Sequence, residues 1–186
     1  MVVKKIIQQC KRSGVIALYE DEMRRTQWIG DMKSFYPLYK MPQFDEETLC
    51  KAYDISEKQA EKIQFAHSRI PGNINFADVD EGEHVCDPLN MTLVYANRQV
   101  QPYMTSQGIK FMDKRYMAAV EDEGETNLEV YERFTKEGFM YFAVKVGLQL
   151  VAIIFPIDVV TKSFIETLRE VYMRSAAMLG SEGNNE

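Results

Sequence analysis

The stretch LEVYERFTKEGFMYFAVKVGLQLVAIIF, residues 128–155, decides the fold of this chain. It contains three runs of β-branched and aromatic residues, and short turns at Gly138 and Gly147 separate them. Strands that follow one another through turns this short pair in the antiparallel sense. We therefore expect three successive antiparallel strands, at residues 128–134, 139–144 and 148–155.

Upstream of this stretch, further β-prone segments lie in two groups separated by polar and helical sequence. Pro37 fits an edge strand, because a proline cannot donate a ladder hydrogen bond. The expected strands are residues 3–9, 15–19, 26–30, 35–38, 92–95, 100–105, 109–112 and 116–120.

Two helices are expected within residues 44–67, inserted between the two groups of strands. Asp45 is a good N-cap for the first helix. Ser56 and Gln59 form a Ser-x-x-Gln capping box at the start of the second. This segment therefore predicts a helical hairpin packed on the domain.

A last helix is expected at residues 161–179. Thr161 can cap its start, and Gly180 follows its end. Apolar residues recur at helical spacing along one face, which predicts that the helix lies across one face of the sheet. The fold class is α+β, mainly antiparallel β-sheet, with a single domain over residues 1–180 and a polar tail at 181–186.

Length and composition are those of a globular protein. The chain has 186 residues, of which 46% are hydrophobic and 27% charged. No apolar run is long enough for a membrane span or a signal peptide, so a cytoplasmic location without a membrane partner is expected. The three cysteines are widely spaced, which predicts neither disulfides nor a zinc site.

The net charge of −6 is unevenly distributed. Residues 1–40 carry eight basic and four acidic side chains, and residues 91–120 carry four and one. Residues 41–90 and 121–186 are acidic. A cleft with one electrostatic sign requires that the fold bring the two basic segments together; otherwise the charges form a solvated surface of mixed sign.

Residues 70–90 predict a long acidic loop, and loops of this length are often functional. A calcium loop needs glycine at its sixth position and glutamate at its twelfth, but counting from Asp78 these positions hold Glu83 and Leu89. Zinc would need a second ligand pair beside His84 and Cys86. We therefore expect a solvated loop, with no metal and no cofactor.

Catalytic motifs are not apparent. The only histidines are His67 and His84, and neither a nucleophile elbow nor a phosphate-binding glycine loop occurs. The nearest approach to a metal-dependent nuclease is Asp31-Met32-Lys33, with Asp21 upstream, in an apparent turn. The chain is therefore expected not to be an enzyme.

Two kinds of binding surface remain open. Residues 48–63 have roughly the apolar spacing of a helix-turn-helix, although the acidic start of the first helix would repel phosphate. Basic and aromatic residues on the strands suit either a protein partner or single-stranded nucleic acid. The candidate partner-binding residues are Arg24, Arg25, Trp28, Asp78, Asp80, Glu81, Glu83, Arg98, Lys110, Lys114, Arg115, Glu121, Asp122 and Glu123.

The stretches IIQQCKRSG, ALYEDE, TQWIGD, FYPLY and TSQGIKFMDKRY resemble a family of small proteins carried by prophages of clostridial gut bacteria. One branch of that family is similar to the phage anti-CRISPRs directed at Cas9. The resemblance implies a non-catalytic inhibitor whose partner is a host protein, namely the Cas9–guide RNA complex, and which blocks DNA engagement or cleavage. It assigns no functional residue.

The leading hypothesis is therefore a non-enzymatic binding protein that inhibits a host defence nuclease. Its acidic segments, 78–87 and 121–125, could occupy the nuclease's DNA-binding groove. The alternatives are a nucleic-acid-binding regulator that uses residues 48–63 or the basic strand faces, and a metal-dependent hydrolase.

Overall fold

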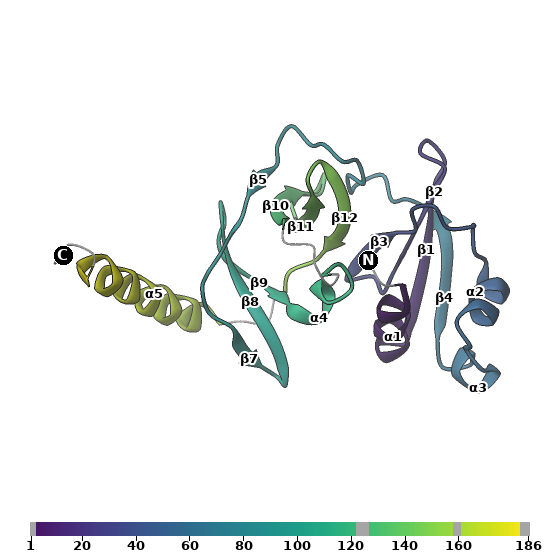
Figure 1. Ribbon diagram of the computed structural model, residues 1–186, viewed down its shortest axis with the longest axis horizontal. Coiled ribbons are helices and arrows are strands. Elements are labelled where there is room, and N and C mark those ends of the chain that lie inside the picture. Colours follow the sequence, from purple (N-terminus) through teal and green to yellow (C-terminus); the bar gives the residue numbers. More distant parts are fainter. Residues whose placement is uncertain (1–2, 122–126, 158–160, 183–186) are drawn as a thin grey trace.

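The computed structural model describes residues 3–121, 127–157 and 161–182, which form two β-sheets and five helices (Figure 1). The helices are α1 (Val3–Ser13), α2 (Glu46–Ala52), α3 (Glu57–Ala60), α4 (Lys114–Met117) and α5 (Lys162–Glu182). The larger sheet has the order β4 (Gln64–Arg69), β1 (Val15–Asp21), β2 (Thr26–Gly30), β3 (Ser34–Pro37), β12 (Gln149–Ile154), β11 (Met140–Val146), β10 (Leu128–Phe134) and β5 (His84–Val85). The smaller sheet contains β6 (Asp87–Pro88), β7 (Leu93–Tyr95), β8 (Arg98–Thr105) and β9 (Gly108–Asp113).

The α+β class and the mainly antiparallel pairing are confirmed. Strands β10, β11 and β12 form the predicted meander, with Val130 opposite Val144 and Ala143 opposite Ile153. Strand β12 then pairs with β3, with Ile153 opposite Phe35. This pairing joins the meander to the N-terminal strands in one sheet.

In the larger sheet, strand β1 is covered on both faces. Ile16 and Leu18 of β1 point into the core beneath α1. The alternate residues Ala17 and Tyr19 point into a second core, where Phe76 from the loop after β4 packs. Burial on both faces explains why residues 15–19 of β1 are a continuous apolar run, because a strand with one solvent-exposed face would alternate apolar and polar residues.

Residues 3–13 form α1, so the expected strand at 3–9 is wrong. Ile6, Ile7 and Cys10 are buried on one side of the helix, at helical spacing. The β-branched pair at 6 and 7 suggested a strand, but burial against β1 and β2 outweighs that weak propensity.

The inserted segment 44–67 holds α2 and α3, but not a hairpin of two full helices. The Asp45 side chain accepts a 2.8 Å hydrogen bond from Thr48 N and caps α2 as expected. Helix α3 is a single turn, and residues 64–69 form β4, which runs parallel to β1 over six residue pairs. A helix-turn-helix needs a full second helix, so this segment has no recognition helix for a DNA groove.

The smaller sheet contains the β8–β9 hairpin, whose turn places Gly108 at φ 90°. The expected strand at 116–120 is wrong, because residues 114–117 form α4. Asp113 ends β9 and caps α4, since its buried carboxylate accepts a hydrogen bond from Arg115 N.

Helix α5 extends away from both sheets rather than lying across one of them (Figure 1). Its first turns pack on the smaller sheet through Ile165, Leu168 and Tyr172, whereas Val171 is 50% exposed. The helix continues through Gly180 to Glu182, beyond its expected end. None of the helices in the described part of the chain combines the length and apolar character needed to cross a membrane.

Candidate anion-binding cleft

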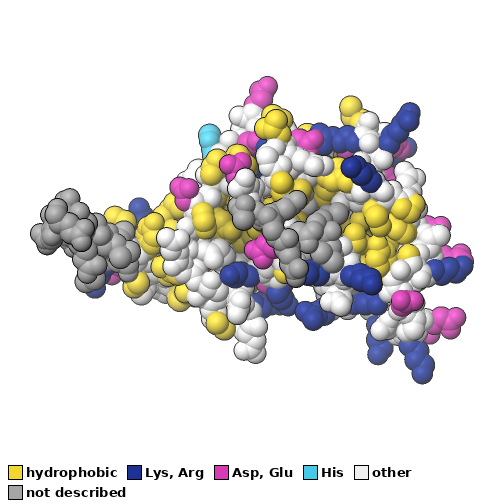
Figure 2. Space-filling model, in the orientation of Figure 1, with side chains coloured by type: hydrophobic (Ala, Val, Ile, Leu, Met, Phe, Trp, Pro, Cys, Tyr) yellow, Lys and Arg dark blue, Asp and Glu magenta, His cyan; other side chains and the backbone are white. Residues whose placement is uncertain are grey.

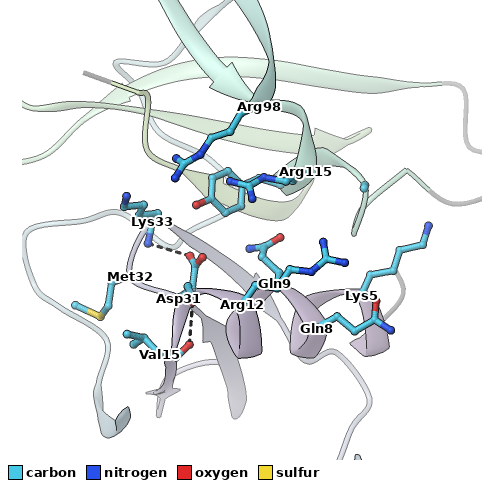
Figure 3. A pocket seen from close by; sticks show the side chains of 13 residues that line it. Lys5, Gln8, Gln9, Arg12, Val15, Asp31, Met32, Lys33, Arg98 and Arg115 are labelled. Carbon is cyan, nitrogen blue, oxygen red and sulfur yellow. Dashed lines mark hydrogen bonds between the residues drawn. The ribbon is translucent and has the colours of Figure 1, made fainter. Parts of the chain in front are cut away.

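A cleft of about 730 Å³ lies where α1, the turn between β2 and β3, the start of β8 and helix α4 meet (Figure 3). Its lining residues are Lys5, Gln8, Gln9, Arg12, Ser13, Val15, Asp31, Met32, Lys33, Arg98, Arg115, Tyr116 and Ala118. Five of these side chains are cationic, and one is a carboxylate. Figure 2 shows lysine and arginine side chains gathered over α4 and α1.

The fold brings the two basic segments of the sequence together at this cleft. Residues 5–33 supply one part of the lining, and residues 98–118 supply the other. The buried Tyr36 connects them, because its hydroxyl donates a 2.8 Å hydrogen bond to the Tyr116 carbonyl across the core. The two basic segments therefore meet, in a cleft that is mainly cationic and also contains the Asp31 carboxylate.

Helix α1 forms one wall. Its buried face holds the helix on the sheet, which leaves Lys5, Gln8 and Arg12 exposed on the side that lines the cleft. Gln9 lies between the two faces and donates a 2.7 Å hydrogen bond to Ser34 Oγ. That bond fixes its amide beside the turn that forms the next wall.

The turn between β2 and β3 presents Met32 and Lys33. Asp31 Oδ1 accepts hydrogen bonds from Lys33 N, Ser34 N and Ser34 Oγ, each 3.1 Å long. Met32 adopts a left-handed φ of 69°. A Cβ on Gly30 would lie 1.8 Å from the Ser34 carbonyl oxygen, so this tight turn requires glycine at its start.

Arg98 and Arg115 form the opposite wall (Figure 3). Arg115 donates from Nε at 3.0 Å and from Nη2 at 2.6 Å to the fully buried Asp113 carboxylate. These hydrogen bonds hold the pKa of Arg115 above its ordinary value. Beside them, burial raises the pKa of the Tyr116 hydroxyl, which stays protonated at neutral pH.

The other four cationic side chains of the cleft form no ion pair with any residue that the structure describes: Lys5, Arg12, Lys33 and Arg98. A concave surface that holds unpaired cations is a site of positive potential. Lysine and arginine are the side chains that recognise phosphate, and arginine can do so with two parallel hydrogen bonds. The arrangement is therefore suited to hold a phosphate-bearing ligand.

Of the predicted partner-binding residues that the structure describes, only Arg98 and Arg115 lie in this cleft. Trp28 is 1% exposed and packs edge-on against Phe76, so its ring belongs to the core and not to a surface. Arg24 forms an ion pair with Asp78 at 3.2 Å.

Arg25 and Glu81 are exposed, away from the cleft. Lys110 lines a separate hollow beside Phe139, and Lys114 lines another with Glu121. Asp122 and Glu123 lie outside the described residues.

The acidic loop is held internally. Glu83 forms ion pairs with Arg133 and Lys145, whose side chains are 0% and 4% exposed. Asp78 Oδ1 accepts a 2.9 Å hydrogen bond from Leu150 N. These carboxylates fasten the loop to the sheet.

Asp80 is also held inside the loop. Burial alone would raise its pKa, but hydrogen bonds from Asn75 and Gly82 outweigh burial and lower it. Among the residues that the structure describes, no three His, Cys, Asp or Glu side chains group so as to hold a metal ion.

Sequence reasoning missed the α1 and turn residues of the cleft. Lys5, Gln9 and Arg12 recur at helical spacing, which would have placed them on one helix face had residues 3–13 been interpreted as a helix. The apparent turn at Asp31-Met32-Lys33 is present: the Asp31 carboxylate accepts a hydrogen bond from Ser34 N, and the turn presents Lys33 to the cleft.

In comparisons with known proteins, no family model, no curated protein and no solved structure matches this chain.

Proposed function

We propose that this chain is a non-enzymatic binding protein that engages a phosphate-bearing partner through the cationic cleft. The observation that carries the proposal is the convergence of five cationic side chains, four of them without an ion pair among the described residues, around one concave volume. Gathering like charges costs free energy through repulsion. An anionic partner would remove that cost, and phosphate matches the donors present.

The contacts of the acidic loop, residues 70–90, favour the cationic cleft over the loop as the partner-binding surface. Asp78, Asp80 and Glu83 are engaged with backbone or side-chain donors of the same chain. A partner would have to break these contacts to use the carboxylates. In the cleft, Arg115 is held by Asp113, but the other four cations have no ion pair among the described residues to break.

A nucleic acid is the partner class that the first experiment addresses. The purified chain is titrated against a labelled single-stranded RNA of about 20 nucleotides with a 5′-hydroxyl end. Fluorescence anisotropy is recorded at several salt concentrations. We expect binding that weakens as salt rises, because each phosphate contact releases condensed counterions.

Two double variants locate the site. In the first, Arg12→Glu and Lys33→Glu reverse two charges of the cleft. In the second, Lys58→Glu and Lys62→Glu make the same charge change at exposed positions on and just after α3. We expect at least a tenfold loss of affinity in the cleft variant, and a salt slope shallower by about 1.4. Equal losses in the two variants would contradict the proposal.

A guide-RNA-loaded host nuclease is a particular partner that one further observation favours. Three stretches that carry the resemblance to phage anti-CRISPRs also line the cleft: IIQQCKRSG supplies Gln8, Gln9, Arg12 and Ser13, TQWIGD supplies Asp31, and TSQGIKFMDKRY supplies Arg115 and Tyr116. On this proposal the chain acts in the bacterial cytoplasm, and the cleft holds phosphates of the guide RNA, so that DNA engagement or cleavage by Cas9 is blocked.

The inhibitor proposal is tested with purified Cas9, with and without its guide RNA, on immobilised chain. We expect capture of the loaded complex, no capture of the RNA-free protein, and inhibition of target cleavage. The Arg12→Glu/Lys33→Glu variant should lose both effects. Cleavage that is unchanged at saturating wild-type chain would contradict this partner while leaving the phosphate proposal open to the RNA titration.

A further inference from the structure

We propose that the ligand group in the cleft is a polyphosphate attached to a nucleoside, that is, a nucleoside triphosphate or the 5′-triphosphate end of an RNA. This inference rests on the proposed function, because it names the chemistry of the same site. It goes further by separating a compact, terminal anion from the internal phosphodiester backbone of a nucleic acid.

The size of the cleft is the first reason. A volume of about 730 Å³ lies within the range of pockets that enclose one small-molecule ligand. Proteins that hold a single strand along its backbone use an extended groove with several exposed aromatic rings on which bases stack. Tyr116 is the only aromatic residue in the described lining, and its side chain is buried. The cleft therefore lacks the stacking platforms of a strand-tracking groove.

Charge is the second reason. An internal nucleotide carries one negative charge, whereas a terminal phosphate carries close to two and a triphosphate more, within a few ångströms. Figure 3 shows Arg98 and Arg115 on one wall and Arg12 on the facing wall, with Lys33 at the side. Cations from different walls can contact separate phosphates of one compact group, so a polyphosphate should bind more tightly than the internal phosphodiesters of an RNA.

The remaining lining fits the nucleoside. Gln8 and Gln9 supply amides that can donate and accept, and Met32 and Ala118 supply apolar surface. The Gln9 amide is fixed by its hydrogen bond to Ser34. These side chains lie beside the cations, so they can contact the nucleoside of the same ligand.

The first arm of the experiment uses small molecules. Thermal unfolding of the chain is followed with 1 mM ATP, AMP, adenosine or inorganic triphosphate, without divalent cations. For a Kd near 10 µM, ATP should raise the unfolding temperature by about 5–10 °C. AMP should raise it less, and adenosine should have no effect. The Lys33→Gln/Arg98→Gln variant should lose the shift, and Lys58→Gln/Lys62→Gln should retain it.

The second arm uses RNA of one sequence with either a 5′-triphosphate or a 5′-hydroxyl end. Tighter binding of the triphosphate RNA by tenfold or more, with competition by ATP, supports the inference and identifies an RNA end as the source. An ATP shift with no preference between RNA ends supports it with free nucleotide as the source.

Two results overturn the inference, and they differ in what else they overturn. If both RNAs bind equally and ATP neither stabilises the chain nor competes, the polyphosphate is excluded while the phosphate-binding function stands. If no RNA and no nucleotide binds, both proposals fail. A normal circular dichroism spectrum for each variant shows that it is folded.

Discussion

Replacing Glu83 by glutamine tests whether the acidic loop is a structural fastening. Glu83 is 13% exposed and faces two cations, Arg133 and Lys145, that are 0% and 4% exposed. Removing one partner of a buried ion pair leaves an uncompensated charge, at a cost of about 3–5 kcal/mol. Arg133 also donates to the carbonyls of Asn75 and Ala77, so part of its hydrogen bonding survives.

We therefore expect Glu83→Gln to lower the free energy of unfolding by about 3 kcal/mol, the lower end of that range. For a chain of this size that corresponds to an unfolding temperature lower by about 6–12 °C. Calorimetric or circular dichroism melts at neutral pH measure it directly. The matched control is Glu81→Gln, an exposed neighbour that should change the free energy of unfolding by less than about 0.5 kcal/mol. If Glu83→Gln melts within 2 °C of wild type, the loop is not held by this cluster.

Two further predictions concern the turn that presents the cleft lysine and the accessibility of the thiols. Gly30→Ala should lower the free energy of unfolding by about 3 kcal/mol, because the added Cβ would clash with the Ser34 carbonyl. Gly72→Ala, whose Cβ would have no atom within 4 Å, should be nearly neutral. Urea unfolding measures both changes, and equal effects would contradict the turn geometry. With iodoacetamide at pH 8, Cys50 should be alkylated well before Cys86, because Cys86 is buried and burial raises its pKa to about 12. Mass spectrometry follows both reactions, and equal labelling rates would contradict the burial of Cys86.

Local patterns predict the meander. Between Leu128 and Phe155 every strand is rich in β-branched and aromatic residues, and each turn contains glycine, so propensity and tertiary structure agree. The N-cap at Asp45 is predicted for the same reason, since a cap depends only on residues within one turn.

Elements whose identity depends on distant partners are not predicted. Residues 64–69 are a strand because β1 lies beside them, and no local signal distinguishes that segment from the end of a helix. Residues 3–13 are a helix because Ile6 and Cys10 bury against the sheet.

The cleft likewise depends on contacts between residues that are distant in sequence. Its two basic segments are visible in the charge pattern, but Arg98 and Lys33 are far apart in sequence. Their meeting depends on the fold, through contacts such as the hydrogen bond from Tyr36 to the Tyr116 carbonyl. Residue types alone equally favoured Trp28 and Glu83 as partner-binding residues. The structure shows that Trp28 is buried and that Glu83 forms an ion pair with Arg133.

The most direct test of the central claim follows the arginine Nε–Hε signals by NMR while RNA with a 5′-triphosphate is added. We expect saturable shifts for Arg12, Arg98 and Arg115, which line the cleft, and none for Arg69 or Arg169, which lie outside it. Shifts confined to Arg69 and Arg169, with the cleft signals unmoved at saturation, would contradict it.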